Sequence, residues 1–253
     1  MKLNTFKNKF LLLLFLFLGS SNLVWASMVD GKRYIITDYG AVADNRTDNS
    51  NVINKVIDIA YKNGGGVVVI PKAMQPFIFI QINVKSNVTL KGEGGILKFK
   101  DNVAINKKKA YYPINNLGYN NSSFINLIID GNMVKNTDFS VCDMITCIGE
   151  NSKVISCKIY NAPDSGIMFS NTKNGVCQNN EIIGGRDCGI YINANSKGAN
   201  SGSVINNNTV KNFIITGIAV KRHSYGVTID SNSIEDCGNG ISIENSSSVN
   251  QGF

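Results

Sequence analysis

Gly166-Ile167-Met168-Phe169 is the first copy of a motif that occurs four times in the chain. The later copies are Gly189-Ile190-Tyr191-Ile192, Gly217-Ile218-Ala219-Val220 and Gly240-Ile241-Ser242-Ile243. The glycines of consecutive copies are 23, 28 and 23 residues apart. A second mark precedes each copy by eight or nine residues, at Cys157, Asn180, Asn208 and Asn232. Two motifs whose spacing is nearly constant over four copies indicate an internal repeat between Val154 and Ser248.

The repeat is too short for a strand–helix–strand unit, and turn-forming Gly, Asn, Asp and Ser join its apolar pieces. Such a period fits one coil of a β-solenoid with three short strands. Stacked coils lie ~4.8 Å apart, so Asn180, Asn208 and Asn232 are expected to form a hydrogen-bonded row inside one bend. Parallel crossovers are almost always right-handed. We therefore predict an all-β fold, a right-handed, single-stranded parallel β-helix.

The first residues have the composition of an export signal. The 253-residue chain starts with Lys2, Lys7 and Lys9, continues with the apolar run Phe10–Leu18, and offers small residues at Val24-Trp25-Ala26. We predict that residues 1–26 are a cleaved secretory signal and that the protein is secreted, periplasmic or on the cell surface. An uncleaved anchor is the alternative. Cleavage would lower the net charge from +7 to +4, because the segment holds three lysines and no acid.

Six cysteines follow this segment, which in a secreted chain invites a disulfide interpretation. The positions of the cysteines within the repeat argue against a full framework of disulfide bonds. Cys177 shares its place with Val154 and Ile205, and Cys147 shares its place with Phe169. Both are expected to be buried thiols, and Cys157 takes the place of an asparagine in the row. A bridge among Cys142, Cys188 and Cys237, which lie nearer to turns, stays open.

Ahead of the repeat, the chain reads Asp38-Tyr39-Gly40-Ala41-Val42-Ala43-Asp44 and then Thr47-Asp48-Asn49. Thr47 to Ser50 supply N-capping residues for an apolar-periodic run that predicts a short helix, and Asn63-Gly64-Gly65-Gly66 end it. A buried strand, Val67 to Pro71, follows. This series, from Tyr34 to about Ile70, resembles the N-terminal signature of the pectate lyase superfamily, which includes pectate-lyase-like, polygalacturonase-like and tailspike-like proteins.

The resemblance implies a right-handed β-helix whose short N-terminal helix covers the open end of the solenoid. We expect one domain over residues 27–253, with the cap signature at 34–71 and the coils at 88–248. Asn106 to Asn121 interrupts the coils and is predicted to be a loop, either an ordinary surface loop or a wall of a sugar site. The sequence stops at Asn250–Phe253 with no capping element, which predicts contact with a partner, including another copy, or a longer protein.

Alternation along the Gly-Ile strands predicts which side chains face outward. The outward rows are Met168, Tyr191, Ala219, Ser242 and Ser170, Asn193, Lys221, Glu244. In the resembled family this face usually carries the substrate, so Ser170, Asn193 and Glu244 are candidate substrate-binding residues.

The candidate catalytic residues are Tyr191, Lys221, Arg222 and His223. A lyase that removes the proton beside a uronate carboxylate needs a base and a cation, and this group can supply both. Asp164 and Asp187 lie two residues before a repeat glycine, one coil apart, and could bind Ca²⁺ or share acid–base work. The plain alternatives are that both aspartates are turn residues and that 221–223 is a solvated bend.

The leading functional hypothesis is a polysaccharide lyase that cleaves an anionic, uronate-containing polymer by β-elimination, with Ca²⁺ as the cofactor to test. Gly-His-Gly and Asp-Asp elements of polygalacturonase-like hydrolases are absent, as is the Asp-Pro-His segment of mannuronan epimerase-like proteins. The alternatives are a non-catalytic β-helix for glycan binding or surface assembly, and a glycoside hydrolase or tailspike-like depolymerase. No motif points to a nucleic acid, and no membrane contact is expected after signal cleavage.

Overall fold

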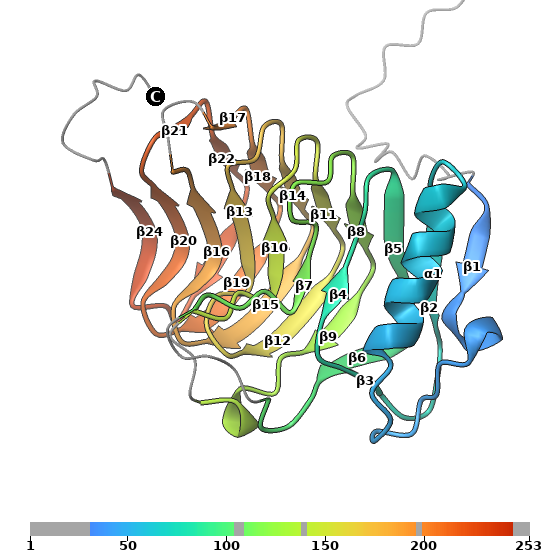
Figure 1. Cartoon of the computed structure of the whole chain (residues 1–253). Helices are drawn as coiled ribbons and strands as arrows, with labels where there is room; N and C mark the ends of the chain where they lie inside the picture. The colour runs from blue at the N-terminus through green and yellow to red at the C-terminus, as the bar shows by residue number, and fades with distance from the viewer. Residues whose placement is uncertain (1–30, 104–108, 138–140, 196–198, 245–253) are drawn as a thin grey trace, which may run out of the picture.

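The computed structural model describes residues 31–103, 109–137, 141–195 and 199–244, and within them the chain winds into a parallel β-helix (Figure 1). Strands from successive coils stack into three parallel sheets. The repeat sets this register, because each Gly-Ile copy stacks on the one before it: Ile167, Ile190, Ile218 and Ile241 are partners in turn. The predicted right-handed β-helix with a short N-terminal helix is confirmed.

From β2 onward each coil contributes one strand to each of three sheets, named A, B and C in the order in which the chain meets them, and β1 adds one more strand to sheet A. Sheet A contains β1 (Arg33–Ile35), β2 (Gly66–Pro71), β5 (Val88–Glu93), β8 (Ser123–Ile125), β11 (Lys153–Ile155), β14 (Val176–Gln178), β18 (Val204–Asn206) and β22 (Thr228–Asp230). Sheet B contains β3 (Phe77–Phe79), β6 (Ile96–Phe99), β9 (Ile128–Asp130), β12 (Lys158–Ala162), β15 (Glu181–Gly185), β19 (Thr209–Phe213) and β23 (Ser233–Glu235).

Sheet C carries the Gly-Ile strands. It contains β4 (Ile82–Asn83), β7 (Ile114–Asn115), β10 (Ile145–Cys147), β13 (Ile167–Ser170), β16 (Cys188–Asn193), β20 (Thr216–Lys221) and β24 (Asn239–Glu244). A small fourth sheet pairs β17 (Asn200–Ser201) with β21 (Ser224–Tyr225). Two short 3-10 turns, η1 (Ile36–Tyr39) and η2 (Met133–Lys135), complete the elements beside the helix. The predicted loop at Asn106–Asn121 was wrong in part, because Ile114–Asn115 is the sheet C strand β7; residues 106–108 of that prediction lie outside the described residues.

Helix α1 (Ser50–Lys62) closes the N-terminal end of the solenoid (Figure 1). Its buried face consists of Ile53, Val56, Ile57 and Ala60, which are fully buried against the first coil. The predicted N-capping segment, Thr47 to Ser50, lies at the start of the helix, but Asn49 in the N-cap position makes no side-chain capping hydrogen bond. The Asn49 amide instead bonds to backbone groups of other segments, among them Val42, while the Asp48 carboxylate accepts a hydrogen bond from the Ser50 backbone amide at 2.9 Å. No helix in the described part of the chain is long and apolar enough to cross a bilayer.

The asparagine row inside the bend between sheets A and B is confirmed. Asn180 Nδ2 donates to Asn208 Oδ1 at 2.9 Å, and Asn208 Nδ2 donates to Asn232 Oδ1 at 2.9 Å. At the lower end the backbone amide of Cys157 donates to Asn180 Oδ1. Because Asn180 and Asn208 are buried, each amide satisfies groups that would otherwise be costly orphans.

All six cysteines lie in described residues and are free. Five are buried, and Cys237 is partly exposed. The two alignments predicted from the repeat hold: Cys177 pairs with Val154, and Cys147 pairs with Phe169. The thiols therefore serve the core as small apolar side chains.

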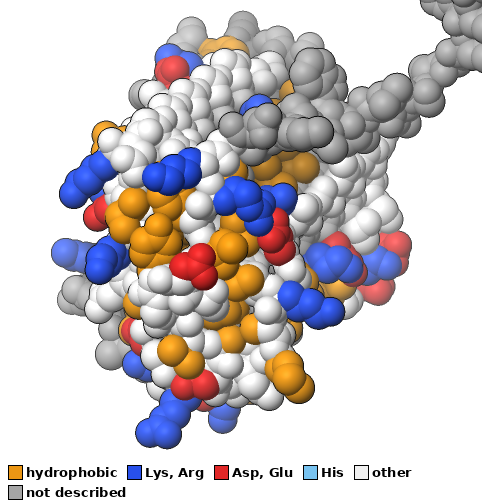
Figure 2. All heavy atoms as spheres, turned by 90° about the vertical axis from the view of Figure 1, so that its right-hand side faces the viewer, with side chains coloured by type: hydrophobic (Ala, Val, Ile, Leu, Met, Phe, Trp, Pro, Cys, Tyr) orange, Lys and Arg blue, Asp and Glu red, His pale blue; other side chains and the backbone are white. Residues whose placement is uncertain are grey.

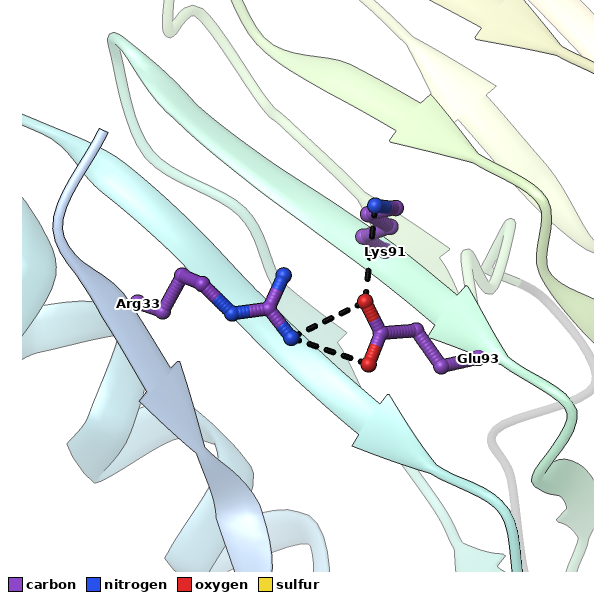
Figure 3. A network of polar contacts seen from close by, with 3 residues as sticks. All are labelled: Arg33, Lys91 and Glu93. Carbon is purple, nitrogen blue, oxygen red and sulfur yellow. Dashed lines mark hydrogen bonds and ion pairs between the residues drawn. The ribbon is translucent and has the colours of Figure 1, made fainter. Parts of the chain in front are cut away.

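The outer face of sheet A shows how the first coils are held on the surface (Figure 3). Arg33 of β1 donates to both carboxylate oxygens of Glu93 of β5 at 2.9 Å, across the intervening strand β2. Lys91 adds a third contact to Glu93 at 3.4 Å. Arg33 and its hydrogen bonds hold the pKa of Glu93 below its usual range. Since all three side chains are partly exposed, the network contributes about 1 kcal/mol or less.

Candidate functional site

The strands of sheet C stack the predicted outward row in order, but Met168 and Ala219 are buried, at 4% and 0% exposed. Met168, Tyr191, Ala219 and Ser242 are successive partners in β13, β16, β20 and β24, and Thr146 of β10 precedes them. The second row pairs Ser170 with Asn193 and Lys221 with Glu244.

Three carboxyl groups meet where the strands of sheet C begin, and we call Asp143, Asp164 and Asp187 the carboxylate cluster. Each lies just before a strand, β10, β13 or β16. Asp164 and Asp187 are neighbours in consecutive coils, because the backbone amide of Asp187 donates to the carbonyl of Asp164 at 3.3 Å. The Asp164 carboxylate accepts a hydrogen bond from the Cys142 backbone amide at 3.2 Å. The Asp187 carboxylate accepts one from the Ser165 hydroxyl at 3.4 Å. Both side chains are half-buried and so remain open to a ligand.

The electrostatics of the cluster are unusual for carboxyl groups. Burial raises the pKa of Asp143 to about 7, against hydrogen bonding from Ser165, and the charges of Asp164 and Asp187 add to the rise. Burial also raises the pKa of Asp164 to about 6; the Cys142 amide opposes this and the charge of Asp187 supports it. A carboxyl group that keeps its proton near neutral pH can act as a general acid.

Asp143 was not predicted, although the repeat contained the signal. Ile145 is the partner of Ile167, so counting back two residues places Asp143 beside Ser165 and next to Asp164. The Asp143 side chain is 1% exposed, and its Oδ2 has no hydrogen-bond partner. Burial is the main cause of the raised pKa of Tyr112, and the charge of Asp143 adds to it. This tyrosine therefore lies beside the cluster on the preceding coil. The sequence places Tyr112 in the segment predicted to be either an ordinary surface loop or a wall of a sugar site.

Arg186 has a structural position at the edge of the cluster. Its Nε donates to the carbonyl of Pro163, and its Nη1 donates to the carbonyl of Thr137 at 2.7 Å. The guanidinium therefore fastens the turn that carries Asp164 to the neighbouring coil. Its charge slightly opposes the rise of the Asp164 pKa.

At the other end of the same strands the side chains are cationic. Lys221 Nζ lies 5.7 Å from the centre of the Tyr191 ring and 3.1 Å from Glu244 Oε1. Burial lowers the pKa of Lys221, but the hydrogen bond and charge of Glu244 outweigh it, so the net shift is upward. Burial raises the pKa of Tyr191, against the charges of Lys221 and Arg222. Lys221 is thus held as a cation above an aromatic ring.

The remaining predicted residues lie around this end. Arg222 and His223 form the turn after β20, with φ values of 44° and 32°, a left-handed region that is strained for side chains of this size. Arg222 is exposed, and Nδ1 of the half-buried His223 has no partner. Ser170 is only 7% exposed, and Asn193 is half-buried. These four residues lie at or after the ends of β13, β16 and β20, whereas the carboxylate cluster lies before the starts of β10, β13 and β16.

Metal ligation was expected at Asp164 and Asp187. Among the described residues no group of three or more His, Cys, Asp or Glu side chains is arranged to hold a metal ion. The pair alone offers at most two carboxylate ligands, and Ca²⁺ takes about six to eight oxygens. A cation there would need further ligands from a substrate or water.

The solved structures that are similar to this chain resemble it in fold. The structure of an exopolygalacturonase from Thermotoga maritima matches with a TM-score of 0.60 and 15% identity, over 85% of this chain and 69% of the other. The A-module of a mannuronan C-5 epimerase from Azotobacter vinelandii matches with a TM-score of 0.55 and 14% identity, over 85% and 77%.

A third similar structure is PfbA, a surface adhesin of Streptococcus pneumoniae. It matches with a TM-score of 0.65 and 15% identity, over 79% of this chain and 56% of that one. At such identities these likenesses show the fold alone. No curated protein matches the chain.

The decisive comparison is with a family model described as rhamnogalacturonase A/epimerase, pectate lyase-like, which matches residues 34–242. The match begins in β1 and ends in β24, so it covers the capping helix and every coil described above. The chain therefore belongs to the rhamnogalacturonase A/epimerase, pectate lyase-like family.

Proposed function

We propose that the protein is an enzyme that cleaves glycosidic bonds of an extracellular polysaccharide at the carboxylate cluster. One observation carries the proposal. Asp164 and Asp187 lie side by side in consecutive coils, both half-buried, and burial raises the pKa of Asp164 to about 6. A pair of carboxyl groups in different environments is the arrangement that glycoside cleavage requires.

In this proposal the two aspartates have different catalytic roles. Protonated Asp164 donates to the glycosidic oxygen as the bond to the anomeric carbon breaks. Asp187 supplies the carboxylate that activates water or stabilises the developing positive charge on the sugar. Burial, supported by the charge of Asp187, raises the pKa of Asp164 and so favours its protonated form. The names of the family and of two similar structures support a polysaccharide as the substrate.

β-Elimination on a uronate polymer is the second candidate, and a specific contact favours it. Lys221 is a cation that lies 5.7 Å from the Tyr191 ring, close enough to neutralise a uronate carboxylate beside a base. Arg222 would add a second cation, and Ca²⁺ at Asp164 and Asp187 would act in the same way. This lyase predicts products with unsaturated ends, whereas the acid–base pair predicts saturated ones.

A non-catalytic β-helix that binds glycans is the remaining alternative, and the similarity to a surface adhesin supports it. Export fits all three functions, because their polymers lie outside the cell. The leader-like residues 1–26 lie outside the described residues, so secretion is part of the proposal.

The experiment is a cleavage assay on pectate, rhamnogalacturonan and alginate, with Ca²⁺ or with EDTA. New reducing ends and ultraviolet absorbance from unsaturated ends are followed together. The proposal predicts reducing ends without absorbance, unaffected by EDTA, and their loss in Asp164→Asn. The exposed Asp38→Asn is the matched control. Absorbance that depends on Lys221 would replace the proposal by the lyase, and binding without any cleavage would overturn both.

A further inference from the structure

Two tyrosines and a lysine meet on the rim of the first coils, where the chain turns from sheet C to sheet A, and we call Tyr61, Lys85 and Tyr119 the tyrosine corner. Tyr61 lies in the last turn of α1, Lys85 follows β4, and Tyr119 follows β7. Lys85 Nζ lies 5.4 Å from the centre of the Tyr61 ring and 5.9 Å from the centre of the Tyr119 ring. The ring centres are 5.8 Å apart, and the ring planes are inclined by 71°. The cation therefore holds both rings in one arrangement.

Packing of the core does not account for the tyrosine corner. The buried face of α1 already closes the N-terminal end of the solenoid, yet Tyr61 is 41% exposed and Leu117, on the turn of Tyr119, is 47% exposed. Figure 2 looks onto this end and shows hydrophobic and aromatic side chains at the surface, between charged ones. Apolar side chains that gather on a surface in this way are typical of binding sites.

The next coil leaves Tyr119 open to a ligand. Lys85, Tyr119 and Gly149 hold corresponding positions in three successive coils, because the backbone of each of these turns donates to the next turn. A Cβ atom at Gly149 would lie 1.8 Å from the carbonyl oxygen of Tyr119, so only glycine allows this close approach. Lys85 thus contacts the ring from the preceding coil, whereas the following coil adds no side chain at this position.

The charge of Lys85 is already paired. Its ammonium lies 2.6 Å from a carboxylate oxygen of Asp58, and the two side chains are 25% and 46% exposed. The corner therefore offers two aromatic rings and a neutralised ion pair whose carboxylate can accept hydrogen bonds from hydroxyl groups. A sugar ring matches this chemistry, because it has C–H groups on its faces and hydroxyls around its edge.

A row of exposed asparagines, the outer ladder, continues along the same rim and contains Asn87, Asn121, Asn151 and Asn174. Each Nδ2 donates to the Oδ1 of the asparagine before it, at 3.1, 2.9 and 3.2 Å in turn. An amide has two N–H donors and two acceptor lone pairs, so both middle members keep one of each outside the ladder. Donors and acceptors for a ligand therefore repeat once per coil, ~4.8 Å apart.

We propose that the tyrosine corner binds a sugar ring of a polysaccharide strand and that the outer ladder carries the strand onward along the rim. A sugar residue in an extended glycan is about as long as the spacing of the coils, ~4.8 Å, so successive sugars meet successive amides. The rim follows the ends of the sheet C strands, whereas the carboxylate cluster precedes their starts. The inference rests on the proposed function only in taking a polysaccharide as the ligand, and it does not require cleavage.

Affinity electrophoresis in native gels that contain rhamnogalacturonan, pectate or alginate tests the corner. Every protein carries Asp164→Asn, which removes the proposed cleavage, so that a failure of catalysis and a failure of this site are separate results. At least one polymer should retard the parent protein, and Tyr61→Ala or Tyr119→Ala should raise its Kd about fivefold or more, because stacking needs the ring. Tyr119→Phe keeps the ring and should bind like the parent.

Tyr39→Ala is the matched control, since Tyr39 is 38% exposed and lies on η1, outside the corner. Exposed charges are largely screened at about 0.5 M salt, and Lys85 is already paired, so the difference between the parent and Tyr119→Ala should persist there. No retardation in any gel, an equal loss in Tyr39→Ala, or a difference that vanishes in salt would overturn the proposal.

The outer ladder has its own pair of variants. Asn151 and Asn126 are both exposed, with φ values of 56° and 53°, and glycine accepts this left-handed backbone. Asn151→Gly removes a ladder amide and should raise the Kd about twofold or more. Asn126→Gly, in the turn between β8 and β9, should leave the Kd unchanged. Equal Kd values for the two variants would contradict the part of the proposal that concerns the ladder.

Discussion

The two ends of the sheet C strands differ sharply, although the same repeat builds both. At the start of the strands Asp143 is buried without a partner for Oδ2, and burial raises the pKa of both Asp143 and Asp164. At the finish Lys221 is paired with Glu244, which is 58% exposed, and solvent reaches both. Buried ionisable groups with raised pKa values mark candidate functional sites. Charges that are paired and solvated contribute little to stability. The carboxylate end is therefore where we expect activity.

Asp164→Asn should have the largest effect, because the amide cannot donate a proton as an acid. We expect the cleavage rate to fall about 10²- to 10⁴-fold, with little change in substrate binding. Rates of reducing-end release, measured beside the melting temperature, check this. A variant that is fully active and folded would remove the acid role from Asp164.

Asp143→Asn should stabilise the protein at alkaline pH. The pKa of Asp143 is raised in the folded state, so its proton favours folding at low pH, and this stability is lost as the pH rises from about 4 through about 7. Asparagine carries no charge to bury, so the gain above pH 8 can reach a few kcal/mol, on the order of the linkage term. Denaturant unfolding at pH 5 and pH 8 is the measurement. Equal stability changes at the two pH values would contradict the burial argument.

Lys221→Met tests the cationic end. The substitution keeps much of the apolar stem over Tyr191 but removes the charge. For an anionic polymer we expect KM to rise about tenfold, a loss of about 1.4 kcal/mol, with kcat within a factor of two. Steady-state kinetics separate the two constants. A collapse of kcat instead would bring Lys221 into the chemistry and favour the lyase.

Glu244→Gln should have the smallest effect. Its ion pair with Lys221 is at the surface, so we expect a change in unfolding free energy of about 0.5 kcal/mol or less. Equilibrium unfolding at low and high salt gives the value. A loss that is large and independent of salt would mean that the cationic end is held more tightly than its exposure indicates.

The sequence by itself determined the solenoid. A Gly-Ile phrase at fixed spacing, with an asparagine ahead of it, fixes which residues stack, and stacking fixes the register, the asparagine row and the interior thiols. These are consequences of periodicity, and periodicity can be read from the chain. The same counting placed Asp164 beside Asp187 and Lys221 beside Glu244. It would have found Asp143, had the alignment been extended two residues ahead of Ile145.

Tertiary structure decided what burial does to these side chains. The chain could not show that Asp143 has a carboxylate oxygen with no partner, that Lys221 turns back over Tyr191, or that Asn49 bonds to other segments in place of capping the helix. The physical reason is that a repeat sets positions along the coil axis. Desolvation, pairing and pKa depend on which neighbouring segments pack over a side chain, and those segments lie far apart in the sequence.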